Sequence, residues 1–217
     1  MEVAMIKIQK LGFAYPGDKL VFNDLDFLYE KGQKVGIVGP NGSGKTTLFY
    51  LIMGLLKRQE GEIEIFNKVR QTEKDFEDVR RRIGFLFQNP DHQLFCPTVA
   101  EDIAFGPLNL GKTHKEAREI VSRISDLLGL EKYIDRASYK LSWGEKRLVC
   151  LATVLAMEPE ILLLDEPTAG LDERSTHKVL DYLKNNGPSF IIASHDMNFL
   201  KTLTDKIYLL NGGKILY

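Results

Sequence analysis

The chain has 217 residues, which suits one domain with a sizeable core. Its 29 Lys and Arg residues against 30 Asp and Glu residues give a formal net charge of -1, so no overall electrostatic attraction draws it to nucleic acid or to an anionic membrane surface. No apolar run reaches the roughly 18 residues of a membrane span, and the N-terminus lacks the apolar stretch of a signal peptide. These features predict an intracellular chain.

The first third of the chain alternates apolar and polar residues in the manner of half-buried strands. Such runs cover residues 3–15, 20–30 and 62–67, each bounded by Gly, Pro, Asp or Asn. A different pattern stands between the second and third runs. There, an apolar strand over residues 34–39 enters a glycine-rich loop, which leads into a helical run over residues 46–56. A strand, loop and helix in this order predict an α/β fold.

The loop between that strand and helix reads GPNGSGKT and matches the phosphate-binding motif G-x-x-x-x-G-K-[ST]. Its glycines allow backbone N–H groups to turn toward phosphate oxygens, and the helix N-terminus adds its dipole. Lys45 is expected to reach the β- and γ-phosphates, and the Thr46 hydroxyl to bind Mg²⁺. The predicted nucleotide-binding residues of this segment are Gly39, Pro40, Asn41, Gly42, Ser43, Gly44, Lys45, Thr46 and Thr47.

The middle of the chain changes from strand to helix. Residues 83–88 read IGFLFQ and predict a buried strand, and the mixed-charge run over residues 68–82 predicts a solvated helix face and its approach. From about residue 89 to residue 160 the pattern is helical, and residues 114–130 form the clearest amphipathic segment. Because this stretch lies between strands of one sheet, we expect an inserted helical subdomain.

One helix of that subdomain begins within LSWGE, residues 141–145. Ser142 followed by Glu145 predicts a capping box, in which each side chain bonds the backbone N–H of the other residue. Apolar residues at helical spacing follow. The positive N-terminal end of this helix therefore presents a serine hydroxyl, a glycine and a tryptophan.

Two adjacent carboxylates, Asp165 and Glu166, end the apolar run ILLL over residues 161–164. A strand that is buried on both faces gains no stability from two carboxylates at its end. Asp165 suits the Mg²⁺ shell, and Glu166 can activate an attacking water as a general base. His195 directly follows the next apolar strand, residues 189–194, and could hydrogen-bond a γ-phosphate or orient water.

The last part of the chain predicts a helix over residues 175–186 and a hairpin over residues 206–217, with Asn-Gly-Gly at its turn. Cys96 and Cys150 lack the spacing of metal ligands and are predicted to be small buried hydrophobic side chains. No internal repeat or flexible linker divides the sequence, so we expect a single domain over residues 1–217.

In this order the motifs resemble those of the ATP-binding cassette (ABC) ATPase family along essentially the whole chain. GPNGSGKTT corresponds to the Walker A motif of the family, ILLLDE to Walker B and LSWGE to the signature. Gln88 falls on the Q-loop glutamine, residues 169–172 on the D-loop and His195 on the switch histidine. The resemblance implies an α/β P-loop NTPase cassette with a RecA-like core, an N-terminal antiparallel β subdomain and an inserted α-helical subdomain over about residues 89–160.

The resemblance also implies the roles of individual residues. ATP would be the nucleotide and Mg²⁺ its metal, and Tyr15 in FAYPG would stack on adenine. A role in hydrolysis is implied for Lys45, Gln88, Glu166 and His195, and Mg²⁺ binding for Thr46, Gln88 and Asp165. Two cassettes of this family pack head to tail, so Ser142 and Gly144 would meet the γ-phosphate held by a second ABC ATPase subunit, as helix N-termini bind anions.

This sequence departs from the family at two positions of the signature. Most members have glycine at the position of Trp143 and glutamine at the position of Glu145. The charge of Glu145 would weaken phosphate binding unless it points away, and Trp143 must find room at the interface or narrow it. We hypothesise a heterodimer with unequal sites, and the alternative is a homodimer that tolerates Trp143. ATPases of energy-coupling factor importers, which this sequence also resembles, often continue into a C-terminal dimerisation segment. This sequence ends at Tyr217, so we expect a weaker dimer in isolation.

The loop NPDHQLF and the following TVAEDIAFG resemble more narrowly the ATPases of energy-coupling factor (ECF) importers and related cobalt or nickel uptake systems. This implies an ATP-hydrolysing subunit on the cytoplasmic face of the cell membrane that powers uptake of a vitamin or of cobalt or nickel. A groove from Gln88 to Phe105 would take a coupling helix of a transmembrane subunit. Its expected apolar residues are Leu94, Phe95, Val99, Ile103 and Phe105, and the alternative is that about half of them belong to the core of the helical subdomain.

Two other classes of function remain as alternatives. A soluble ABC ATPase that acts on nucleic acid or ribosomes usually carries long coiled-coil insertions or two cassettes, and the sequence has neither. We therefore expect no nucleic-acid partner. A P-loop kinase or GTPase has no place for the signature at Ser142 or for His195.

Overall fold

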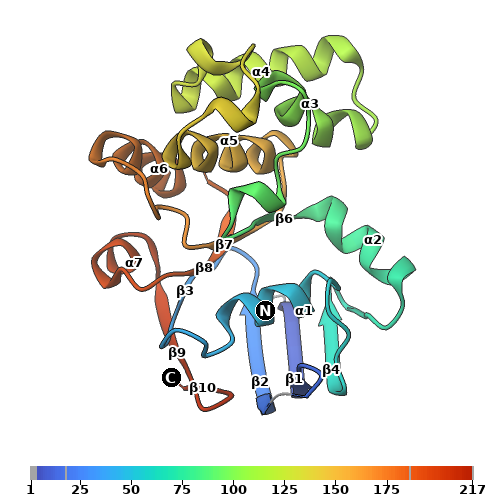
Figure 1. Cartoon of the computed structure of the whole chain (residues 1–217). Coiled ribbons are helices and arrows are strands. Elements are labelled where there is room, and N and C mark those ends of the chain that lie inside the picture. The colour runs from blue at the N-terminus through green and yellow to red at the C-terminus, as the bar shows by residue number, and fades with distance from the viewer. Residues whose placement is uncertain (1–3, 18, 186, 217) are drawn as a thin grey trace.

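The computed structural model describes residues 4–17, 19–185 and 187–216 and arranges them as two sheets with helices (Figure 1). The first residue of the strand expected over residues 3–15 lies outside the described residues. So do the last residue of the helix expected over residues 175–186, and Tyr217 at the end of the expected hairpin and of the sequence.

The first sheet is antiparallel and comes from the N-terminal part of the chain. Its strands follow the order β2 (Leu20–Glu30), β1 (Ala4–Ala14), β4 (Glu60–Ile65) and β5 (Lys68–Val69). Alternate residues of β2, namely Leu25, Phe27 and Tyr29, are buried, as a strand with one face on the core requires. The expected antiparallel β layer is confirmed.

The second sheet forms the centre of the molecule and is parallel except for its last strand. The order is β10 (Lys214–Leu216), β9 (Lys206–Asn211), β3 (Lys34–Val38), β8 (Ser189–Ala193), β7 (Ile161–Asp165) and β6 (Ile83–Leu86). Ala193 of β8 pairs with Ile37 of β3 on one side and with Asp165 of β7 on the other. The C-terminal ends of three strands therefore meet at one edge, which is where parallel sheets bind ligands.

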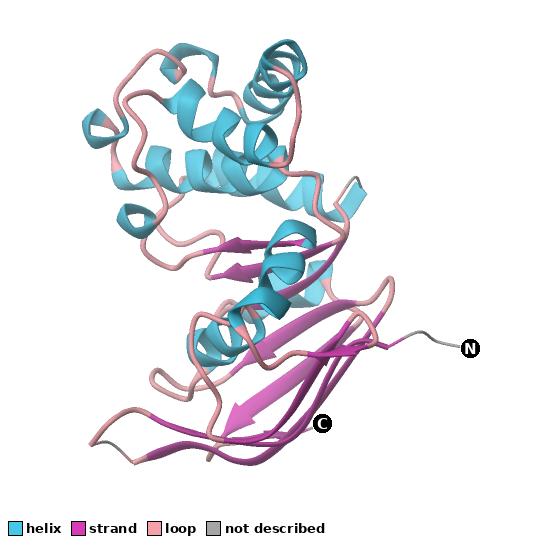
Figure 2. Ribbon diagram, turned by 90° about the vertical axis from the view of Figure 1, so that its right-hand side faces the viewer, coloured by secondary structure: helices cyan, strands magenta, loops and turns pink. Residues whose placement is uncertain are grey.

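Helices lie on both sides of the parallel sheet. The side toward the antiparallel sheet carries α1 (Lys45–Ile52) and α2 (Glu73–Arg82), whereas α7 (Met197–Leu203) packs against β3 on the opposite face. Figures 1 and 2 show a separate helical layer on the opposite side, made of α3 (Val99–Asn109), α4 (His114–Leu128) and α5 (Trp143–Ala156), with α6 (Glu173–Asn185) beside it. Short 3-10 turns occur at Pro90–His92, Glu131–Tyr133 and Ser138–Lys140. None of the helices in the described part of the chain is long and apolar enough to cross a membrane.

The helix expected over residues 46–56 ends earlier, at Ile52. Gly54 lies in the left-handed region with a φ of 69°, a conformation that ends helices. A Cβ at Gly54 would stand 2.2 Å from the ring of Phe76 in α2. Gly54 is therefore both the local stop of α1 and the point where Phe76 of α2 packs closely on the turn.

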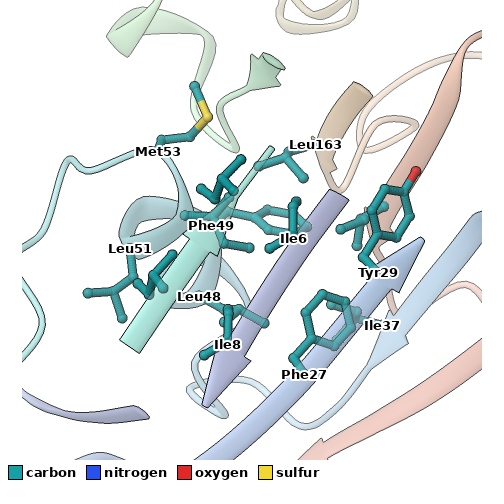
Figure 3. Packing of buried hydrophobic residues seen from close by; sticks show 14 of the residues in the cluster. Ile6, Ile8, Phe27, Tyr29, Ile37, Leu48, Phe49, Leu51, Met53 and Leu163 are labelled. Atoms are coloured by element: carbon teal, nitrogen blue, oxygen red, sulfur yellow. The ribbon is translucent and has the colours of Figure 1, made fainter. Parts of the chain in front are cut away.

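Two apolar cores lie on the two faces of the parallel sheet. Figure 3 shows part of the first core, in which side chains of β1 and β2 meet those of α1, among them Ile6, Ile8, Phe27, Tyr29, Leu48 and Phe49. Leu163 of β7 belongs to this core, whereas Leu162 and Leu164 belong to the second core beneath α5. This explains why the strand before the two carboxylates is entirely apolar.

The two cysteines differ in burial. Cys150 is fully buried in the second core, as expected, and burial raises the pKa of its thiol to about 12. Cys96 is only partly buried, so the expectation that it is a core side chain is wrong. It lies in the loop before α3, where its backbone N–H donates to Asp102 Oδ1 at 2.9 Å.

Candidate active site

The loop between β3 and α1 is shaped by its glycines. Gly42 and Gly44 have φ angles of 77° and 103°, which side chains rarely adopt, and a Cβ at Gly39 would stand 2.3 Å from the carbonyl oxygen of Leu210. Gly44 caps α1 without a side-chain hydrogen bond, so the first N–H groups of the helix remain open to a ligand. Ser43 Oγ is buried and has no hydrogen-bond partner among the described residues. The loop is therefore a cradle of donors that fits phosphate oxygens.

Lys45 and Thr46 begin α1 at the edge of this cradle. Lys45 Nζ donates to the carbonyl oxygens of Gly39, at 2.7 Å, and Pro40, at 3.1 Å, so the ammonium group is folded over the loop. Thr46 Oγ1 donates to Asp165 Oδ2 at 2.5 Å. This hydrogen bond joins the start of α1 to the end of β7, although the two residues are far apart in the sequence.

Asp165 is a buried carboxylate with a side chain suited to a hard metal ion. The residue is 1% exposed, and burial raises the pKa of its carboxyl, while the hydrogen bond from Thr46 acts in the opposite direction. Mg²⁺ prefers oxygen ligands, and the Thr46 hydroxyl, the Asp165 carboxylate and the Gln88 amide supply them around one cleft. These residues fit the metal that the resemblance implies.

Glu166 lies beside His195 at the ends of β7 and β8. Glu166 has a φ of 50°, which is uncommon for a residue with a side chain, and strained backbone of this kind clusters at functional sites. Its Oε2 accepts a hydrogen bond from Ser194 Oγ at 3.1 Å. Its Oε1 accepts one from the His195 backbone N–H at 3.2 Å and lies 2.9 Å from His195 Nδ1. The structure thus brings the predicted base and the predicted switch histidine into contact.

Most of the predicted site residues line one cleft of about 1020 Å³. They are Tyr15, Pro40, Asn41, Gly42, Ser43, Gly44, Lys45, Thr46, Thr47, Gln88, Asp165 and Glu166. Gly39 and His195 do not line it: Gly39 packs on Leu210 at the start of the loop, and His195 contacts Glu166, which does line the cleft. Tyr15, expected to stack on adenine, lies at this cleft with its hydroxyl 3.1 Å from Thr47 Oγ1.

Sequence reasoning missed part of the cleft wall, namely Lys19, Leu20, Val21, Asn211, Gly212 and Gly213. The Asn-Gly-Gly signal was visible, but it indicated only a hairpin. The fold brings this turn against β2, where the Asn23 N–H donates to the Gly213 carbonyl oxygen at 3.4 Å. A Cβ at Gly213 would stand 2.8 Å from the Val21 carbonyl oxygen, so the close approach requires glycine there.

Ser142 and Gly144 do not line this cleft. They belong to a second cavity of about 740 Å³, together with Gly170 and Asp172 of the D-loop segment and with residues of α4 and α6. The capping box is confirmed, because Ser142 Oγ accepts from the Glu145 N–H at 3.3 Å and Glu145 Oε2 accepts from the Ser142 N–H at 2.7 Å. One chain therefore carries two separate parts of the predicted site.

The unusual signature residues each have a defined place. A hydrogen bond from the Tyr133 side chain is the main cause that lowers the pKa of the Glu145 carboxyl, followed by the Ser142 N–H, so donors within the chain stabilise its charge. A Cβ at Gly170 would stand 2.4 Å from Trp143 Cδ1, and one at Gly144 would stand 2.7 Å from the Gly170 carbonyl oxygen. Trp143 thus packs on the D-loop segment and leaves 47% of its surface exposed.

The expected groove from Gln88 to Phe105 is only partly present on the surface. Val99 and Ile103 are fully buried in the core of the helical layer, so for these two residues the groove lining is wrong and the core alternative is confirmed. Both residues lie on the side of α3 that packs against α4 and α5. Phe95 and Phe105 are 67% and 46% exposed, with ring centroids 4.8 Å apart and edge-to-face. These two rings form an exposed apolar patch.

A phosphate cradle, a buried aspartate beside a threonine and a glutamate at the end of a parallel strand define the class of P-loop ATPases. The ABC transporter family model matches residues 22–169, and the chain belongs to this family. It is 40% identical over 216 residues to the energy-coupling factor transporter ATP-binding protein EcfA of Methanocaldococcus jannaschii, covering 98% of this chain and 77% of that protein. The EcfA of Methanococcus maripaludis is 38% identical over 218 residues, with 99% and 78% covered.

Solved structures agree with these relatives. The structure of cbiO1 from Clostridium perfringens, part of the ABC transporter complex cbiONQ, has a TM-score of 0.84 at 33% identity and covers 99% of this chain and 88% of that one. A dimeric bacterial ABC transporter cassette has a TM-score of 0.90 at 28% identity, with 98% and 97% covered. The expected ABC cassette fold is confirmed, and the chain is an ATP-binding ATPase.

Proposed function

We propose that this chain is the ATP-hydrolysing subunit of an ECF-type importer, attached to the cytoplasmic face of the membrane and powering uptake of a vitamin or of cobalt or nickel. The observation that carries the proposal is the division of the site. Lys45, Asp165 and Glu166 lie at one cleft, whereas Ser142 lies at a separate cavity. A chain built in this way needs a second cassette to complete each site. The relatives named EcfA and the cbiO1 structure support the importer class.

Each residue of the cleft has a task in ATP hydrolysis. The open N–H groups of the loop and Lys45 bind the phosphates, and Tyr15 packs on the adenine ring. Thr46, Asp165 and Gln88 would hold Mg²⁺, which supplies positive charge to the phosphate oxygens. Glu166 accepts a proton from the attacking water, and His195 holds the Glu166 carboxylate in place from the neighbouring strand.

The signature completes the site of the other cassette. Ser142 and the backbone of Gly144 lie at the N-terminus of α5, where the helix dipole favours an anion. Glu145 Oε2 accepts the Ser142 N–H at 2.7 Å, so its carboxylate is turned back to the cap of its own helix. The exposed rings of Phe95 and Phe105 are the surface on which we place the coupling helix of the membrane subunit.

The test is the solution mass of the Glu166→Gln chain, measured by light scattering with and without Mg-ATP. Blocked hydrolysis should trap the closed pair, so ATP should raise the mass from 24.7 kDa to twice that value if the partner is a second copy. ATP binding without a change in mass, followed by a mass increase once a second cassette is added, means a heterodimer. A chain that binds no ATP, or that stays monomeric with every cassette partner, contradicts the proposal.

A further inference from the structure

Arg147 lies in the second turn of α5. Among the described residues it has the largest side chain that is fully buried, with 1% of its surface exposed. Burying a cation away from water is costly, and buried charged side chains are normally paired with opposite charges. Burial lowers the pKa of the Arg147 guanidinium, as this cost requires. A buried arginine in the signature helix therefore needs a reason to be there.

The partners of Arg147 are four backbone carbonyl oxygens from two distant segments. Nη1 donates to Phe87 and, at 3.0 Å, to Gln88, while Nη2 donates to Asp165 and, at 2.6 Å, to Glu166. Nε has no partner among the described residues. The planar guanidinium thus bridges two segments. Nη1 bonds the loop that follows β6, and Nη2 bonds the end of β7 and the residue after it.

Three of the four residues whose backbone is held in this way line the ATP cleft, namely Gln88, Asp165 and Glu166. Their side chains are those assigned to the metal and to the attacking water. A hydrophobic side chain at position 147 would remove a donor from all four carbonyl oxygens, although that of Glu166 would keep the Ala169 N–H at 3.1 Å. A lysine ammonium lacks the flat fork that reaches two pairs at once. The chemistry of arginine is therefore matched to this place.

We propose that Arg147 is a positioning residue for ATP hydrolysis: through the backbone of Gln88 and Glu166 it sets the geometry of the catalytic side chains and links them to α5. The N-terminus of the same helix carries Ser142 and Gly144. A displacement of α5 when the signature meets the partner's nucleotide reaches the chain's own cleft by way of this guanidinium. Only this last step rests on the proposed pairing of two cassettes.

The chain contains a matched control in Arg70. Arg70 is also buried, at 2% exposure, and also donates to backbone carbonyl oxygens, those of Ile65 and Asp75, besides an ion pair with Asp78. None of these residues lines the ATP cleft. Loss of a buried arginine for purely structural reasons should therefore look the same at both positions.

The experiment compares Arg147→Met, Arg147→Lys and Arg70→Met in the protein assembled with its second cassette. Melting temperature, ATP affinity without hydrolysis, kcat and the Mg²⁺ concentration for half-maximal rate are measured for each. We expect Arg147→Met to lower kcat about 100-fold, since displacements of about 1 Å have such effects, and to raise the Mg²⁺ requirement, with ATP affinity changed less than about threefold. Arg147→Lys should lose about tenfold, and Arg70→Met should lose stability alone.

The proposal is overturned if Arg147→Met loses stability as Arg70→Met does but keeps its kcat and Mg²⁺ requirement. If the methionine variant does not fold, a lysine variant with unchanged kcat and Mg²⁺ requirement overturns it equally. Combining Arg147→Met with Gln88→Ala adds a further check, because residues that act as one unit give losses that do not multiply. Multiplying losses contradict the link through Gln88.

These measurements separate the inference from the proposed function. Each result is a ratio of ATP hydrolysis to that of the unsubstituted protein, so it depends neither on the transported solute nor on the membrane subunit. An unsubstituted assembly that does not hydrolyse ATP contradicts the importer function, whereas equal ratios at positions 147 and 70 contradict the role of Arg147.

Discussion

At the residue scale, Asp165 shows how a functional group is kept where stability alone would not place it. Its carboxyl is buried at the end of an apolar strand, and burial raises its pKa from the ordinary value of 3.8. The hydrogen bond from Thr46 and the nearby Lys45 oppose this shift but do not cancel it. The ionised Asp165 carboxylate thus lowers the folding stability of the protein when no cation is bound, and a bound cation offsets this cost.

The destabilising charge of Asp165 predicts how Asp165→Asn changes the stability of the protein. As pH rises from the ordinary pKa to the raised one, the unfolded chain loses its proton before the folded chain does, so the stability of the unsubstituted protein falls over that window and stays lower above it. Without nucleotide, the Asn variant should melt at a higher temperature than the unsubstituted protein at pH 7, and this advantage should shrink toward pH 4. It should also lose ATP hydrolysis. A variant that melts lower at pH 7 would contradict the assigned cost of the charge.

At the scale of elements, α5 connects the parts of the site. Its N-terminus carries the signature, its second turn carries Arg147, and its apolar face packs in the second core under β7. Trp143 adds a contact with the D-loop segment, since its indole fills the space beside Gly170. A helix that touches the Q-loop, the end of β7 and the D-loop segment moves all three when it moves, because packed elements shift as units.

Trp143 is the only tryptophan in the sequence, so its fluorescence reports on this helix end alone. The indole is half exposed in the single chain, and closure of the signature on a partner nucleotide should bury it. In the Glu166→Gln protein paired with a second cassette that carries no tryptophan, Mg-ATP should shift Trp143 emission to shorter wavelength. Mg-ADP, which lacks the γ-phosphate that the signature is expected to meet, serves as the control. An emission spectrum that ATP leaves unchanged would show that Trp143 lies outside the interface.

At the scale of the whole molecule, three layers divide the work. The antiparallel sheet and the β9–β10 turn form the outer wall of the cleft, the parallel sheet carries the catalytic ends of β7 and β8, and the helical layer carries the signature and the exposed pair Phe95 and Phe105. The surfaces that we propose for the membrane subunit and for the second cassette therefore share one layer. Arg147 of that layer bonds the backbone of Gln88 and Glu166, whose side chains line the ATP cleft.

The exposed pair leads to a prediction about assembly. Burying a phenylalanine side chain contributes about 1.5–3 kcal/mol, so Phe95→Ala with Phe105→Ala should weaken binding to the membrane subunit at least about tenfold. ATP affinity should stay unchanged. Leu28→Ala, which removes an exposed apolar side chain from the antiparallel sheet, is the control and should bind normally. Co-purification and affinity measurements of the transporter decide the matter, and normal assembly of the double variant would reject this docking surface.

The sequence by itself determined the features that lie in short continuous segments. The phosphate loop, the pair Asp165 and Glu166 and the capping box at Ser142 were predictable because each depends on neighbours within a few residues and on local backbone geometry. The apolar run before Asp165 indicated a strand buried on both faces, and the two cores confirm it.

Only the tertiary structure decided the features that depend on contacts between distant segments. Arg147 reads in the sequence as one more charge on a helix, and its four carbonyl partners lie just after β6 and at the end of β7. The close packing of Phe76 on Gly54, the outer wall of the cleft at Gly213 and the burial of Val99 and Ile103 also depend on such contacts. Helical periodicity marks an apolar face, but which surface covers that face is set by packing among all the elements at once.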